Sequence, residues 1–201
     1  MKNTKVKMNK VVMLLTLSDV FTWGAFVVIS ALSGIYLSDK LGSNTVQFVG
    51  IGTAIYFIAR GIFQIPIGNL TDKLKKDHDE ILILAIGVIL MGFPYLLYPL
   101  ITQAWQYFAL QFVFGFGVSL NVVNWRKLFA LNIREGMEGK EYAMYDCILS
   151  VSTAVISVIL GIVANINDKY FDMVMISSGI TIMLASVWVL LIKKISNRQS
   201  K

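Results

Sequence analysis

The strongest constraint on the fold of this chain is a set of long apolar runs that contain almost no charge. Residues 11–36 include a single charged side chain, Asp19, and residues 81–105 and 173–192 include none. About 20 such residues span a lipid bilayer, and a spanning segment must be helical because it has to satisfy its own backbone groups. Hydrophobic residues make up 56% of the chain, more than the roughly 45–50% of an ordinary soluble domain. The sequence therefore predicts an all-α membrane protein.

Turn residues and charges between the apolar runs predict six transmembrane helices in one domain over residues 1–201. The helices are expected near residues 11–36, 46–68, 81–101, 104–124, 144–165 and 172–192. The lysine-rich first ten residues resemble the start of a secretory signal. However, the apolar segment after them is about twice the usual length and contains Asp19, so we interpret it as a retained first helix.

Basic residues are distributed unequally between the two sides of the predicted helices. Fifteen of the 18 lysines and arginines fall before the first helix, between the second and third, between the fourth and fifth, or after the sixth. Only Lys40 and Lys169 fall in the other connections. This bias predicts cytoplasmic termini and an inner, cytoplasmic membrane location. It also explains the net charge of +6 without a nucleic-acid-binding face.

Polar side chains are concentrated in four of the six predicted helices. The first, second, fourth and fifth carry polar residues at three- and four-residue steps, and the stripe of the fifth includes Asp146. The apolar runs of the third and sixth carry only hydroxyl groups. We interpret the four polar helices as facing protein or water, and the other two as facing lipid. Close packing through glycine, serine and threonine is the alternative for any single small residue.

Two charged residues lie deep within the predicted spans. Asp19 and Arg60 are each about 8 residues from the cytoplasmic end of their helix, a depth of roughly 12 Å. Equal depth on consecutive antiparallel helices makes an ion pair plausible. A static salt bridge and a gating or substrate-linked charge both remain open, because an intramembrane charge is costly in either case.

Four amide side chains inside the predicted helices are further candidates for a binding site. Amides both donate and accept hydrogen bonds, so they suit a polar or zwitterionic solute, although hydrogen bonding between helices explains them equally well. We interpret Arg126 and Lys127, beside Trp125, as an anchor at the membrane interface, with an anion-binding site as the alternative. The four amides are Gln64, Gln111, Asn121 and Asn124.

Between the second and third predicted helices stands a loop motif that follows Pro66. It resembles the glycine-x-leucine-x-aspartate-arginine-x-glycine-arginine loop of the major facilitator superfamily, which that family carries at this cytoplasmic position. Lys75 replaces the usual glycine. The matching residues are Gly68, Leu70, Asp72, Lys73 and Lys76.

A second stretch, in the fourth predicted helix, supports the same resemblance. Residues Gln111 to Gly117 are similar to the family's arginine-x-x-x-glycine-x-glycine pattern, with Gln111 where many members have arginine. That difference weakens any inference of proton coupling through this position. Residues 150–165 contain no proline, so the glycine-proline motif of drug antiporters is absent and a drug and proton exchanger is not favoured.

The resemblance implies a secondary active transporter that moves a small polar solute across the cytoplasmic membrane. Family members normally have twelve helices in two six-helix halves related by an axis along the membrane normal, and this chain corresponds to one half. We therefore expect a parallel homodimer in the lipid bilayer. Two alternatives stay open, which are one half of a heterodimeric transporter and a non-transporting assembly or sensing subunit.

The resemblance also implies a role for the loop motif in closing the cytoplasmic side. In the family, its aspartate lies against the cytoplasmic end of the fifth helix of the other half, so Asp72 is expected to contact the partner chain. Lys73 and Lys76 are expected to offset Glu141 and Asp146 there.

Residues suited to catalysis or metal binding are scarce. The chain has one cysteine, Cys147, and one histidine, His78, which cannot form a metal cluster or supply a nucleophile with its base. We therefore expect neither an enzyme nor a bound cofactor.

Overall fold

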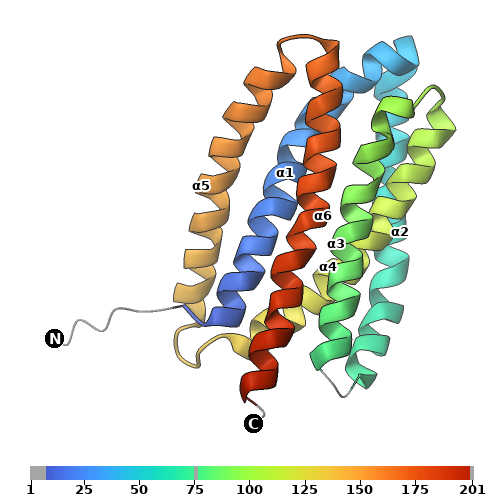
Figure 1. Cartoon of the computed structure of the whole chain (residues 1–201). Helices are drawn as coiled ribbons and strands as arrows, with labels where there is room; N and C mark the ends of the chain where they lie inside the picture. Colours follow the sequence, from blue (N-terminus) through green and yellow to red (C-terminus); the bar gives the residue numbers. More distant parts are fainter. Residues whose placement is uncertain (1–7, 75–76, 200–201) are drawn as a thin grey trace.

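The computed structural model describes residues 8–74 and 77–199, which form six α helices and no strand. All six run along one bundle axis, and α1 begins at the same end of the bundle at which α6 ends (Figure 1). We call this the basic end, because it carries Lys10, Lys73, Lys127, Arg134 and Lys193. The helices are α1 (Lys10–Leu41), α2 (Thr45–Lys73), α3 (Asp77–Leu97), α4 (Ala104–Asn132), α5 (Glu138–Ala164) and α6 (Asp168–Gln199).

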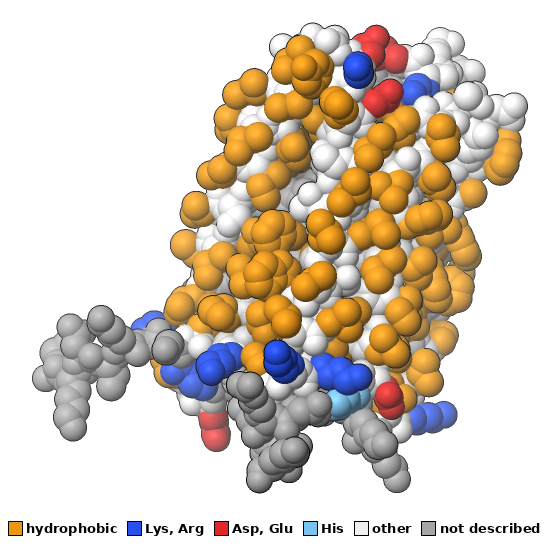
Figure 2. All heavy atoms as spheres, viewed as in Figure 1, with side chains coloured by type: hydrophobic (Ala, Val, Ile, Leu, Met, Phe, Trp, Pro, Cys, Tyr) orange, Lys and Arg blue, Asp and Glu red, His pale blue; other side chains and the backbone are white. Residues whose placement is uncertain are grey.

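Five continuous helical segments of the described residues are long and apolar enough to cross a membrane. The first of them, 10–73, comprises α1, the short 3-10 turn Gly42–Asn44 and α2. Figure 2 shows the corresponding surface, on which hydrophobic side chains cover the region between two charged ends. The prediction of an all-helical chain with several membrane-spanning helices is therefore confirmed, while six separate spans stay a prediction.

The helices continue beyond the predicted spans, because apolar patterning detects only the part of a helix that lies in lipid. α4 ends at Asn132 rather than near residue 124, and α6 ends at Gln199 rather than near residue 192. Local signals set the true ends. The side chain of Asn9 caps α1 by accepting a hydrogen bond from the Val11 amide at 2.9 Å. Gly42 ends α1 with a φ of 73°, a conformation that favours glycine.

Close packing through glycine holds α3 between α4 and α6. A methyl group added to Gly92 would lie 2.5 Å from the carbonyl oxygen of Gly179 on α6. One added to Gly87 would lie 2.7 Å from the backbone nitrogen of Asn121 and 2.9 Å from the carbonyl oxygen of Gly117, both on α4. These backbones can approach so closely only because no side chain intervenes.

Exposure within the single chain does not follow the expected division between outer and inner helices, which stays a prediction. α3 buries Leu84, Val88 and Met91 against its neighbours and exposes apolar residues on its other side only. The least covered helix is α5, on which only Glu141 and Ala164 are buried. The difference arises because α3 packs against two neighbours, whereas polarity along a helix does not report how many neighbours it has.

Candidate functional site

A polar cavity of about 390 Å³ lies between α1, α2, α4 and α5, in the part of the bundle nearer the basic end. Its volume falls within the range of about 300–1,000 Å³ that is typical of small-molecule sites. Three residues of the predicted site, from three different helices, contribute to its wall. The lining residues are Asp19, Trp23, Val27, Arg60, Asn121, Val122, Trp125, Arg126, Tyr145 and Leu149.

Asp19 is the acidic residue of the cavity wall, and only 2% of it is exposed. The hydroxyl of Tyr145 on α5 donates a hydrogen bond to its Oδ2 at 2.7 Å. Its other oxygen, Oδ1, is buried without a hydrogen-bond partner in the described part of the chain. A buried acceptor without a partner costs free energy, so this oxygen is a place where a donor from a solute or from water would be stabilising.

Arg60 is half-buried in the same wall and does not pair with Asp19. Its Nη1 donates to the hydroxyl of Tyr56, one turn earlier on α2, at 3.1 Å. No ion pair within 4.0 Å joins Arg60 to Asp19 in residues 8–74 and 77–199. The expected ion pair is therefore wrong for this structure. Equal depth in the bundle does not make two side chains face each other. Instead, Arg60 contacts the hydroxyl of Tyr56 and Asp19 contacts that of Tyr145.

The two asparagines of α4 have different environments. Asn121 lines the cavity, is 1% exposed, and its Nδ2 has no hydrogen-bond partner within the described residues. Asn124 lies one turn further along, where its Oδ1 accepts from Thr71 Oγ1 at 3.1 Å and its Nδ2 donates to the carbonyl of Leu120 at 2.8 Å. Asn124 therefore joins α4 to α2, and Asn121 is the amide available to a solute.

The other predicted site residues within the helices lie outside the cavity wall. Gln111 donates through Nε2 to the hydroxyls of Tyr107 at 2.8 Å and Tyr98 at 3.2 Å. Gln64 is half-buried on α2 and Asp146 is exposed on α5. None of the three lines this cavity within the single chain. Gln111 is held by tyrosines, whereas the predicted binding or gating roles of Gln64 and Asp146 stay predictions.

Sequence analysis missed several residues that line the cavity. Tyr145 lies one position before Asp146 on α5, and this single step changes which side of the helix faces the cavity. Trp23 and Trp125 add two indole rings to the wall. Arg126 also lines the cavity and is exposed, which supports the alternative of an anion-binding site over a simple interface anchor.

The loop motif at the basic end contacts α4 of its own chain. Lys127 of α4 lies 2.8 Å from Glu80 Oε1 and 3.6 Å from Asp72 Oδ1, and it also donates to the carbonyl of Thr71 at 3.0 Å. The side chain of Glu80 is 5% exposed, whereas that of Asp72 is 79% exposed. Asp72 therefore keeps most of its surface free for a further contact.

The remaining residues of the motif differ in their exposure. Gly68 is half-buried and Leu70 and Lys73 are exposed, and Lys76 lies outside the described residues. Glu141 was expected to meet the basic residues of the motif. Instead it is fully buried and accepts from Arg134 Nε at 2.6 Å. Because this partner lies only seven positions away across the connection from α4 to α5, the local contact forms within the chain.

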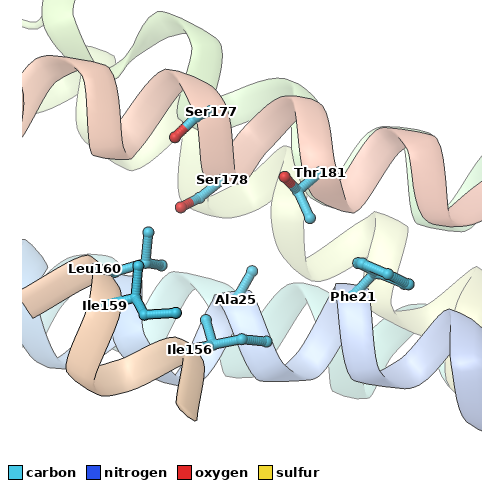
Figure 3. Close-up of a pocket in the computed structure, with 8 residues that line it drawn as sticks. All are labelled: Phe21, Ala25, Ile156, Ile159, Leu160, Ser177, Ser178 and Thr181. Atoms are coloured by element: carbon cyan, nitrogen blue, oxygen red, sulfur yellow. The ribbon is translucent and has the colours of Figure 1, made fainter. Parts of the chain in front are cut away.

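A second cavity, of about 190 Å³, lies between α1, α5 and α6 and is mainly apolar. Figure 3 shows the hydroxyls of Ser177 and Ser178 on α6 above the aliphatic side chains of Ile159 and Leu160 on α5. Its lining residues carry no charge. The polar cavity is therefore the better candidate for the binding site of a polar solute.

Comparison with known proteins agrees with this architecture. The model of the Major Facilitator Superfamily matches residues 12–201 of the 201-residue chain, which confirms the resemblance found in the loop motif and in the fourth helix. No curated protein is similar enough to be matched. The family match and the apolar helices indicate a multi-pass membrane protein of a transporter family. This chain belongs to the major facilitator superfamily.

Proposed function

We propose that this protein is a secondary active transporter that moves a small polar solute across the cytoplasmic membrane. The observation that carries the proposal is the cavity itself. In a bundle whose spans are mainly apolar, it brings together Asp19, Arg60, Asn121 and Arg126 from three helices. Charges inside a membrane protein are expensive and usually mark a solute pathway or a coupling site.

The proposed topology has six spans with both chain termini in the cytoplasm. α1 and α2 each exceed the length of about 20 residues needed to cross a bilayer, and the 3-10 turn at Gly42–Asn44 reverses the chain between them. The concentration of lysine and arginine at the basic end favours a cytoplasmic location for that end.

We further propose that a second copy of the chain completes the transporter as a parallel homodimer. The support comes from α2 and α5, which border the cavity and leave much of their outer faces uncovered. The exposed face of α5 includes Asp146, which lies just inside the predicted span 144–165. A carboxylate that faces lipid is costly, and a protein partner would shield it.

Transport is tested with a two-step experiment on purified protein. A thermal-shift screen first identifies solutes that raise the unfolding temperature, because a ligand of the folded state stabilises it. Proteoliposomes are then assayed for uptake of each hit. The proposal predicts uptake by the wild type and by Gly34→Ala, since a methyl group at Gly34 would meet nothing within 4 Å. It predicts loss of uptake by Asp19→Asn. Binding without uptake in any orientation or gradient would instead support a sensing subunit.

The homodimer is tested by cross-linking two differently tagged chains. One chain carries Asp72→Cys and Cys147→Ser, and the other retains only the native Cys147, which is exposed on α5. A short bifunctional thiol reagent can then link the motif to α5 only between chains. The proposal predicts a covalent dimer that carries both tags. Monomers alone in lipid nanodiscs by native mass spectrometry, together with no cross-link, would contradict it, and a different partner chain would support the heterodimer.

A further inference from the structure

We propose that the solute of the polar cavity is a zwitterion, with its carboxylate bound by Arg60 and Arg126 and its ammonium group bound by Asp19. This inference rests on the proposed transport function and assigns its substrate class. It concerns the residues of one chain, and it holds whichever chain supplies the other half of the transporter.

The charges of the cavity are of both signs and are not paired with each other. Arg60 and Arg126 contribute two guanidinium groups and Asp19 contributes one carboxylate. Across residues 8–74 and 78–195, no acidic side chain lies within 4.0 Å of either guanidinium. If these charges served structure alone, the acidic and basic side chains would be expected to form a direct salt bridge, because separation in a low dielectric weakens their attraction. Separation within one cavity leaves room for a ligand that carries both charges.

The hydrogen-bonding groups of the wall show the same complementarity. Asp19 Oδ1 is a buried acceptor without a donor, and Asn121 Nδ2 is a buried donor without an acceptor in the described residues. An ammonium group supplies donors and a carboxylate supplies acceptors, so one zwitterion satisfies both. Water could satisfy each atom singly but would not neutralise either charge.

Neighbouring residues hold the charged groups of the wall in position. The Tyr145 hydroxyl fixes one oxygen of Asp19, and the Tyr56 hydroxyl accepts one of the five N–H groups of Arg60. The remaining guanidinium donors of Arg60 can bind a carboxylate in the bidentate geometry that arginine favours. Trp23 and Trp125 offer apolar faces for the carbon atoms between the two charges.

Ligands with a single charge fit this wall less well. A simple anion would be attracted by the two arginines but would meet the carboxylate of Asp19. A simple cation would pair with Asp19 but would meet the guanidinium groups. Because like charges at close range are repulsive, either ligand loses part of the binding energy that a zwitterion gains.

The test uses matched solutes and the full chain in detergent or nanodiscs. The probes are alanine, β-alanine and 4-aminobutyrate, each with its amide, which lacks the carboxylate, and with its desamino acid, which lacks the ammonium group. Neutral sugars, dicarboxylates and diamines complete the panel. Binding is measured by thermal shift and then by calorimetry. We expect at least one amino acid to bind, and to bind about tenfold or more tightly than its amide and its desamino acid.

Two variants assign each charge to its residue. Arg60→Gln should abolish the preference for the amino acid over its amide, and Asp19→Asn should abolish the preference over the desamino acid. If the substituted residue had only a structural role, the substitution would weaken the binding of the amino acid, its amide and its desamino acid equally. Binding of only a sugar, a dicarboxylate or a diamine would overturn the zwitterion and leave the transporter standing. No binding by any solute class would overturn both proposals.

Discussion

Two groups of buried polar residues in this bundle differ in whether their members satisfy one another. In the tyrosine cluster, formed by Tyr95, Tyr98, Tyr107 and Gln111, the glutamine amide donates to two tyrosine hydroxyls and the rings pack edge to face or tilted. Within the described residues, no side-chain polar atom of the cluster is fully buried without a hydrogen-bond partner. In the polar cavity, Asp19 and Asn121 each retain such an atom.

The difference indicates which polar residues serve structure and which serve binding. A membrane helix gains stability when its polar groups find partners on other helices, and the tyrosine cluster is of this kind. Groups without partners lower stability. Such atoms also occur at Glu80 and Arg134 near the basic end, but those of Asp19 and Asn121 belong to the wall of a cavity in which a solute could supply the missing partners.

The largest expected effect concerns a buried charge that has an ion-pair partner. Lys127→Met would leave the Glu80 carboxylate, 5% exposed, without the cation that lies 2.8 Å away. Breaking a buried ion pair typically costs about 3–5 kcal/mol, because the remaining charge stays desolvated. Unfolding in mixed micelles should show this loss of free energy. Adding Glu80→Gln should restore much of it, and failure of the double variant to recover would show that Glu80 is not the source.

A smaller loss is expected where α3 supports the wall of the cavity. A methyl group in Gly87→Ala would lie 2.7 Å from the backbone nitrogen of Asn121, so α4 must shift at a cavity residue. Overpacking of this kind costs about 1–3 kcal/mol. Gly34→Ala, whose methyl group meets nothing within 4 Å, is the matched control in the same unfolding assay. Equal stability of the two variants would show that the α3–α4 contact is loose.

The comparison of cluster and cavity is sharpest for two amide-to-leucine substitutions. Gln111→Leu removes the partner of the Tyr98 and Tyr107 hydroxyls and should cost about 1–2 kcal/mol. Asn121→Leu removes a buried donor that has no partner among the described residues, so stability should be unchanged or higher. Both values come from the same micelle unfolding experiment. A reversed order would break the distinction between the two groups.

The smallest effect is expected for the exposed residue of the loop motif. Asp72 lies 3.6 Å from Lys127 and its side chain is 79% exposed, so Asp72→Asn should change the free energy of unfolding by less than about 1 kcal/mol. Its effect on uptake can be much larger if the residue contacts a partner chain in one transport state only. Equal, small effects on unfolding and uptake would argue against that contact.

Much of the architecture could be predicted because it depends on local patterns. Apolar runs located the helices, and the depth of Asp19 and Arg60 placed both in the same region of the bundle, where they now line one cavity. Sequence spacing alone could also have predicted some contacts within a helix. Tyr56 and Arg60, like Tyr107 and Gln111, are four positions apart on a helix, where side chains meet.

The contacts that define the site could not be predicted in this way. Tyr145 binds Asp19 across 126 positions of sequence, and that distance is closed only by the packing of α1 against α5. Likewise, the ion pair between Lys127 and Glu80 forms only because α4 and α3 are rotated about their axes so that these side chains face each other. A polar stripe indicates that a helix has a polar face, but the neighbour of that face depends on the packing of the whole bundle.

The central claim, that the polar cavity binds the transported solute, is tested most directly by uptake in proteoliposomes containing Asn121→Leu or Gln111→Leu. Rates are normalised to the amount of folded protein, and the solute is a hit from the thermal-shift screen. The account predicts that Asn121→Leu loses uptake about tenfold or more while retaining stability, and that Gln111→Leu retains uptake per folded molecule while losing stability. Normal uptake by Asn121→Leu, or loss of uptake by Gln111→Leu alone, would contradict it.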